Sequence, residues 1–178
     1  SSDLAVVTTY PIWFTASGEQ FAADEPILAQ LEQLAFHSPG AVAPVEGAST
    51  AFTPLVETTA DAATFERAAL SPPDPIAIME DYTPAGGVRT LVARIEGEVA
   101  TAFPDGPPEG VEDVTADDHL AASTAPLRLV VLADADFLAD RTWLQRQQLL
   151  GQEFAVPVAN NGDFMVNAAE NLAGGAGL

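Results

Sequence analysis

Leu127-Arg-Leu-Val-Val-Leu-Ala-Asp-Ala-Asp-Phe-Leu-Ala-Asp140 carries the strongest structural signal in the chain. Residues 129–133 form a short, unbroken apolar run, which is typical of a strand that is buried on both faces. Strands of this kind occur in parallel sheets whose two faces are covered by helices. The run therefore predicts an α/β fold with a mainly parallel, Rossmann-like or flavodoxin-like sheet and flanking helices.

The remaining sequence supplies further elements for such a sheet. Apolar or alternating segments predict strands over residues 4–9, 41–45, 52–59 and 90–99. Apolar residues at helical spacing predict helices over residues 24–39, 60–70, 143–150 and 162–173. We expect the last helix to dock beside residues 129–133 with Phe164 as its deepest anchor, and Asn160 or Asn161 to cap its first N–H groups. No internal repeat or clean boundary is visible, so residues 1–178 are interpreted as a single domain.

The chain is strongly acidic. It has 178 residues with 26 acidic and six basic side chains, which give a formal net charge of −20. All six basic residues are arginine. Such a surface repels nucleic-acid phosphates and anionic lipids, so we exclude nucleic acid as a partner. The charge suits high salt or a cationic partner, but a salt-adapted or GC-rich genome produces the same composition without any functional meaning.

Metal and cofactor chemistry finds little support in the sequence. The chain has no cysteine, which excludes thiol catalysis, disulfides and thiolate metal sites. Residues 104–119 combine proline and glycine with many carboxylates, which predicts a long, mobile, acidic loop. The spacing of these carboxylates does not match an EF-hand calcium loop. Nothing indicates that the only two histidines, His37 and His119, meet in space, so we expect neither a metal ion nor a cofactor.

Asp134 and Asp136 follow directly after the predicted strand at residues 129–133, where functional groups gather in open α/β sheets. Paired carboxylates at such a turn hold Mg²⁺ or Mn²⁺ in nucleotide-sugar glycosyltransferases and in phosphoryl-transfer enzymes. The chain has no glycine-rich phosphate loop, no lysine and no Gly-x-Ser-x-Gly motif, so a structural role in the turn is favoured. A metal-dependent glycosyltransferase-like fragment using this motif is the first alternative function, and a carbohydrate-binding module is the second.

Several segments, taken in their order along the chain, resemble the sequence pattern of a known family. They are Leu4–Trp13, Phe52–Thr59, Ala93–Phe103, Leu129–Leu138, Asn161–Ala168 and Asn171–Gly174. The family is the GldG-like auxiliary component of an uncharacterised bacterial ABC transport system, which is associated with motility in gliding bacteria. The chain departs from the family pattern at Ala133 and Ala135, where glycine and serine are usual.

The resemblance implies a non-enzymatic, extracytoplasmic (periplasmic) α/β domain of an inner-membrane protein, with a substrate-binding or gliding-motility role. It implies a membrane helix just beyond Leu178 and a further N-terminal part outside this chain, so that the domain is incomplete here. The implied partners are the ABC permease and ATPase subunits of the same system. The family offers no catalytic residues, and its recurring polar positions form the candidate polar site: Asp134, Asp136, Asn161 and Asp163.

Overall fold

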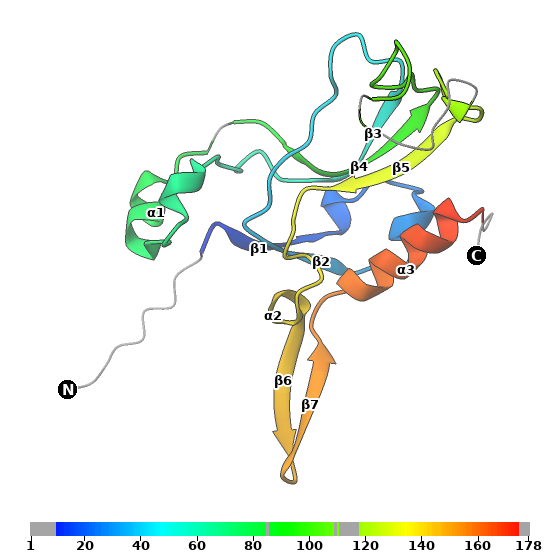
Figure 1. Ribbon diagram of the computed structural model, residues 1–178. Helices are drawn as coiled ribbons and strands as arrows, with labels where there is room; N and C mark the ends of the chain where they lie inside the picture. Colours follow the sequence, from blue (N-terminus) through cyan, green and yellow to red (C-terminus); the bar gives the residue numbers. More distant parts are fainter. Residues whose placement is uncertain (1–9, 85, 109, 111–117, 175–178) are drawn as a thin grey trace.

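The computed structural model describes residues 10–84, 86–108, 110 and 118–174, and its strands form three small sheets (Figure 1). The strands are β1 (Trp13–Ser17), β2 (Gln33–His37), β3 (Ala51–Glu57), β4 (Thr90–Gly97), β5 (Leu127–Leu132), β6 (Leu144–Leu149) and β7 (Gln152–Pro157). The α-helices are α1 (Pro75–Asp81), α2 (Asp140–Trp143) and α3 (Asn161–Leu172), and the 3-10 helices are η1 (Gly18–Gln20), η2 (Pro26–Leu28) and η3 (Arg67–Ala69). The sheets are β1–β2, β3–β4–β5 and β6–β7, and every pairing in them is antiparallel.

The prediction of a mainly parallel, Rossmann-like or flavodoxin-like α/β sheet is wrong. The predicted central strand is β5, an edge strand that pairs only with β4, and Leu129 in it is 40% exposed. A short apolar run has no periodicity, so it does not separate a strand buried on both faces from one at a sheet edge. Parallel strands also need long crossover helices. Among the described α-helices only α3, with 12 residues, is longer than seven residues.

The core lies between the β3–β4–β5 sheet and a second layer formed by β1, β2 and α3 (Figure 1). Phe36, Phe137 and Phe164 pack together in it, with ring centroids 5.5 Å apart for the first pair and 5.6 Å for the second. Phe164 is 1% exposed, which confirms it as the anchor of α3. The helix packs against η2 and β2 as well as against β5.

Two of the predicted helices contain strands in the structure. Residues 24–39 hold only the short η2 before β2, because Gln30 has a φ of 63° that ends the helical turn. Residues 143–150 contain β6, which pairs with β7 across a two-residue turn at Leu150-Gly151. Leucine, glutamine and arginine favour helices when they are isolated, so strand pairing has overridden local propensity here.

The other predicted elements have mixed outcomes. The strands at 52–59 and 90–99 and the helix at 162–173 are confirmed as β3, β4 and α3. The helix predicted at 60–70 is wrong apart from η3, and the strand predicted at 41–45 is reduced to one bridge, between Val42 and Thr90. The strand predicted at 4–9 lies outside the described residues. So do residues 109 and 111–117 of the predicted acidic loop at 104–119, whose mobility stays a prediction.

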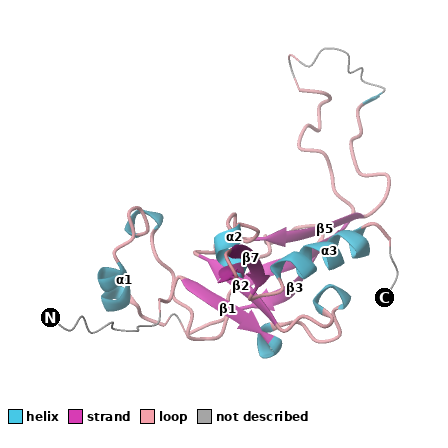
Figure 2. Cartoon of the chain, turned by 90° about the horizontal axis from the view of Figure 1, so that it is seen from below, coloured by secondary structure: helices cyan, strands magenta, loops and turns pink. Residues whose placement is uncertain are grey.

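Three segments extend from the body of the molecule. The β6–β7 ribbon projects away from the core, and residues 58–82 with α1 form an arm on the side where β1 begins (Figure 1). The described parts of the β4–β5 connection project as a further loop (Figure 2). None of the described helices has the length and hydropathy that a membrane crossing requires.

Candidate functional site

Asp134 lies just after β5, and both of its carboxylate oxygens accept hydrogen bonds from backbone N–H groups. Oδ1 accepts from Asp136 (2.8 Å), and Oδ2 accepts from His37 at the end of β2 (2.8 Å). Burial raises the pKa of the Asp134 carboxyl above its ordinary value of 3.8, and the two backbone hydrogen bonds offset part of this rise. The side chain therefore ties the turn after β5 to β2, which is the structural role that the sequence favoured.

Asp136 faces a different set of partners. Its carboxylate accepts a hydrogen bond from Nη2 of Arg141 (2.5 Å), and both side chains are about half exposed or more. The hydroxyl of Thr142 donates to the backbone carbonyl of Asp136 (2.7 Å). The two carboxylates of the Asp-x-Asp motif thus hold different parts of the chain. In the part that the structure describes, no group of three or more His, Asp or Glu side chains could hold a metal ion.

Asn161 is fully buried at the first turn of α3, and its amide is hydrogen-bonded to backbone groups on two other segments. Oδ1 accepts from the N–H of Ala35 (2.9 Å), and Nδ2 donates to the carbonyls of Ala35 (2.9 Å) and Phe137 (2.8 Å). The Asn161 amide therefore bonds to Ala35 as the backbone of a neighbouring strand would, because it accepts from the N–H and donates to the carbonyl of the same residue. It thereby closes the edge of β2 that β1 does not cover.

The predicted cap of α3 is wrong, since neither asparagine side chain binds the free N–H groups of the helix. Asn160 Oδ1 instead accepts from the backbone N–H groups of Glu32 (3.0 Å) and Gln33 (3.3 Å). Nδ2 of Asn160 donates to the exposed carboxylate of Asp163 (3.0 Å). These side chains fix the start of α3 to β2 because β2 offers unpaired backbone groups there.

The structure brings three of the four predicted polar residues to one junction. Asp134 and Asn161 both bind backbone groups of residues 35–37, and Asp136 follows in the same turn, whereas Asp163 lies on the exposed side of α3. We name Ala35, His37, Asp134, Phe137 and Asn161 the Asn161 cluster. The Asp134 and Asn161 side chains of this cluster are hydrogen-bonded to backbone groups and thereby join β2, the turn after β5 and α3. The geometry therefore favours a structural function.

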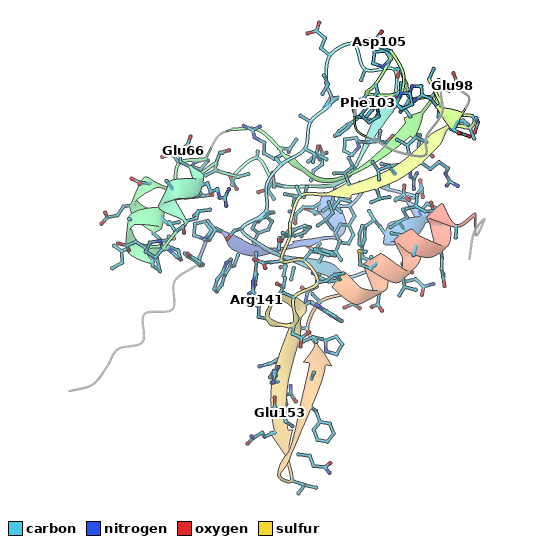
Figure 3. The ribbon with its side chains drawn as sticks, in the orientation of Figure 1. Glu66, Glu98, Phe103, Asp105, Arg141 and Glu153 are labelled. Carbon is cyan, nitrogen blue, oxygen red and sulfur yellow. The ribbon has the colours of Figure 1, made fainter. Side chains whose placement is uncertain are left out.

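The β6–β7 ribbon begins directly beside this cluster and is firmly attached to it. Val158 donates its N–H to the carbonyl of Trp143 (2.8 Å), which closes the base of the ribbon. A Cβ built on Gly162 would lie 2.9 Å from Cη2 of Trp143, so any larger residue at this position would force the Trp143 ring to move away from α3. Figure 3 shows Arg141 at the base of the ribbon and Glu153 further along it.

The two faces of the ribbon differ in chemistry. Cross-strand partners share a face, so the register places Arg146 and Glu153 on one face, where they form an ion pair at 2.8 Å. The opposite face bears no charged residue, and its described side chains are Gln145, Gln147, Gln152, Phe154 and Val156. Phe154 is 45% exposed, and Leu150 at the tip is 96% exposed. We call this side and the tip the neutral face of the ribbon.

A second surface feature, which we name the α1 cleft, lies between the arm and the body. It has a volume of about 490 Å³ and is lined by residues from segments 11–15, 38–41 and 58–65, together with Gln20, Leu70, Met79, Tyr82, Arg89 and Leu91. Most of these side chains are apolar, with one arginine and one aspartate, Asp61, among them. Volumes of roughly 300–1,000 Å³ with apolar walls and few polar groups are typical of small-molecule sites.

A comparison with known families identifies the group to which this sequence is related. A family model described as an ABC-type uncharacterized transport system, auxiliary component, matches residues 3–168, which is most of the chain. The chain belongs to this ABC transport auxiliary family. No curated protein and no solved structure gives a significant match.

In this ABC transport auxiliary protein, the sequence identified Asp134 and Asn161 of the Asn161 cluster but not their partners on β2, and it did not reveal the ribbon or the α1 cleft. The ribbon had only a weak signal, the glycine of Leu150-Gly151 between its two six-residue strands, because neither strand alternates between apolar and polar residues. The cleft had none, because its lining comes from segments far apart in the sequence, and only the fold brings them together.

Proposed function

We propose that this chain is a non-enzymatic, extracytoplasmic domain of a GldG-like inner-membrane protein that assists an ABC transport system. The observation that carries the proposal is the family match over residues 3–168. The engagement of Asp134 with two backbone N–H groups, and of Asp136 with Arg141, supports a structural rather than a catalytic use of these carboxylates. Membrane attachment in this proposal is through a helix outside the described residues.

The partner is the permease subunit of the same system, and the neutral face of the ribbon is the surface that contacts it. Residues 137–162 contain two acidic and two basic residues and so carry no net charge, whereas the whole chain carries −20. A contact made through this segment avoids the cost of removing a dense set of carboxylates from water. The ATPase subunit works on the cytoplasmic side of the membrane and is therefore an indirect partner.

The exposed apolar residues of the neutral face favour burial in a partner. Leu150 and Phe154 lose contact with water only if another surface covers them, and full burial of such a side chain is worth roughly 1.5–3 kcal/mol. An isolated two-stranded ribbon is also marginally stable in water. A partner that encloses the ribbon would pair its free edges as well as cover its tip.

A second copy of the chain is a less suitable occupant. Stable interfaces use roughly 20–30 residues on each side, and the two strands contain 12 residues that are divided between two faces. Two ribbons packed face to face would therefore make a small contact between two acidic proteins. A concave acceptor on a different protein can use both edges and the tip together.

Site-specific photo-crosslinking of the full-length protein, co-expressed with its permease and ATPase in the native membrane, tests the proposal. A photoreactive phenylalanine analogue at positions 150 and 154 should form crosslinks with the permease. The matched control is the same analogue at position 76, because Ile76 on α1 is also apolar and 72% exposed. We expect little crosslinking from that position.

The outcomes separate the parts of the proposal. Co-purification with the permease, with crosslinks from position 76 and none from the ribbon, would retain the transport function and reject the ribbon as the contact. Failure to associate with either subunit would reject the transport function for this protein. Crosslinks from the ribbon to a second copy of the chain would replace the permease with self-association.

A further inference from the structure

We propose that the α1 cleft binds a short apolar peptide with free amino and carboxyl termini. The cleft combines apolar walls with one cation and one anion that are not paired with each other, and this is the pattern that a zwitterion with an apolar body complements. This inference is independent of the ribbon, since it rests on a different surface of the molecule. It also does not depend on which subunit the protein contacts.

The walls of the cleft come from both the body and the arm. On the body side, Ile12 just before β1 and Leu91 of β4 are both buried. On the arm side Met79 of α1 is 36% exposed, so it has apolar surface that remains accessible. A ligand with apolar side chains would cover this surface and gain the free energy of removing it from water.

Arg89 is a cation without a carboxylate partner in the described part of the chain. Four of the six arginines, at positions 94, 128, 141 and 146, form ion pairs with acidic side chains. The guanidinium of Arg89 donates one hydrogen bond, to the carbonyl of Val88 (3.1 Å). Because Arg89 has no carboxylate partner among the described residues of this acidic chain, its guanidinium is available for the carboxylate of a ligand.

Asp61 supplies the opposite charge in the same lining. Among the described residues its carboxylate has no ion pair and no hydrogen bond, and its backbone carbonyl accepts a hydrogen bond from the Tyr82 hydroxyl (2.5 Å). That bond ties the loop carrying Asp61 to the residue after α1. An ammonium group is the natural partner of an exposed carboxylate beside an apolar surface.

The cleft is held in place at both charged residues before any ligand arrives. The backbone of Arg89 is fixed to Thr58, because the N–H of Thr58 donates to the Arg89 carbonyl (2.8 Å) and the Thr58 hydroxyl accepts from the Arg89 N–H (2.9 Å). The Tyr82–Asp61 bond fixes the other side. A site whose walls are fixed in advance loses less conformational entropy on binding.

Charge also distinguishes a zwitterion from other amphipathic ligands. An acyl carboxylate would be attracted by Arg89 but repelled by Asp61 and by the strongly acidic protein as a whole. A peptide with both termini free has no net charge and uses both cleft residues. The volume of about 490 Å³ suits a short peptide rather than a folded partner.

Titration calorimetry with three matched probes tests the proposal: leucyl-leucine, its N-acetyl derivative and its C-terminal amide. Leucyl-leucine should bind most tightly, because each derivative removes one charged end. Asp61→Asn should weaken leucyl-leucine by about tenfold, the value of one charge-assisted hydrogen bond, and should not weaken the N-acetyl derivative, which has no ammonium group and is repelled by the Asp61 carboxylate. Arg89→Gln should weaken leucyl-leucine similarly and should not weaken the amide, which has no carboxylate and is repelled by the Arg89 guanidinium.

Two controls address the acidic background and the arm. Glu66→Gln and Arg67→Gln change exposed charges on the same arm that do not line the cleft, and both should bind leucyl-leucine like the parent (Figure 3 labels Glu66). Equal binding of all three probes would show that the terminal charges are not recognised and would overturn the proposal. Octanoate is titrated as a fourth probe, and tighter binding of octanoate than of leucyl-leucine would replace the peptide with an acyl ligand. Absence of saturable leucyl-leucine binding by the folded protein would overturn the proposal.

Discussion

The Asn161 cluster and the β6–β7 ribbon are neighbours in sequence and in space, yet they differ in how their side chains are used. In the cluster, buried polar groups are fully hydrogen-bonded to backbone atoms, and Phe137 and Phe164 pack beside them. In the ribbon, Phe154 and Leu150 are exposed and every described residue of β7 is accessible to water. The polar groups of the cluster stabilise the fold, whereas the apolar side chains of the ribbon remain exposed and available for a contact with a partner.

The comparison shows that a suggestive motif and a functional surface need not coincide. Asp134-Ala-Asp136 has the appearance of a metal site in the sequence, but its carboxylates bind His37, Asp136 and Arg141. The ribbon sequence has no motif, and the role proposed for it rests on its exposed apolar side chains and its lack of net charge. Substitutions in the two regions should therefore affect different measurements: stability in the cluster, and association in the ribbon.

The largest effect is expected at Phe164, beside the cluster. Phe164→Ala removes a ring that is 1% exposed and that packs against Phe137, so it should lower the free energy of unfolding by roughly 3–5 kcal/mol. Urea unfolding followed by circular dichroism measures the change. Met165→Ala is the control, because that neighbouring side chain is 41% exposed and should matter far less. Equal midpoints for the two variants would show that α3 does not anchor the core.

A somewhat smaller effect is expected at Asn161. Asn161→Ala leaves the N–H and carbonyl of Ala35 and the carbonyl of Phe137 without their partner, and should cost about 2–4 kcal/mol even if water reaches some of them. Asn171→Ala, in the last turn of the same helix, removes only an exposed contact to Arg128 at 3.3 Å and serves as the control. If Asn161→Ala unfolds like the parent, the amide does not join β2 to α3.

The sequence predicted well what depends on local pattern and poorly what depends on pairing. The alternation in residues 90–99 predicted β4, and the stripe of Met165, Ala168, Ala169 and Leu172 predicted α3. The buried face of α3 differs from that stripe, because Phe164 and Ala168 are buried whereas Met165 and Ala169 are exposed. Residues 129–133 were correctly predicted as a strand, but the neighbour of a strand is set by distant residues, and its partner β4 runs antiparallel. Asn161 and Asp134 were identified as polar positions, whereas their backbone partners on β2 had been assigned to a helix.

The smallest expected change in the free energy of unfolding is at the tip of the ribbon, where the direction of the change is more informative than its size. Leu150 and Gly151 have φ values of 54° and 80°, the left-handed backbone of a two-residue hairpin turn, in which asparagine and glycine are preferred. A leucine in this backbone conformation destabilises the folded protein by roughly 1–2 kcal/mol, and Leu150→Asn should remove part of this destabilisation. The variant should therefore unfold at the same or slightly higher urea concentration than the parent.

The same Leu150→Asn variant should reduce co-purification of the permease, because it replaces the most exposed apolar side chain of the neutral face with a polar one. Leu120→Asn is the control, since Leu120 is also exposed, at 61%, but lies in the β4–β5 connection. An apolar residue that lowers the stability of the isolated protein at a fully exposed tip is explained if a partner covers it. A Leu150→Asn protein that keeps full association would leave leucine at this position without that explanation.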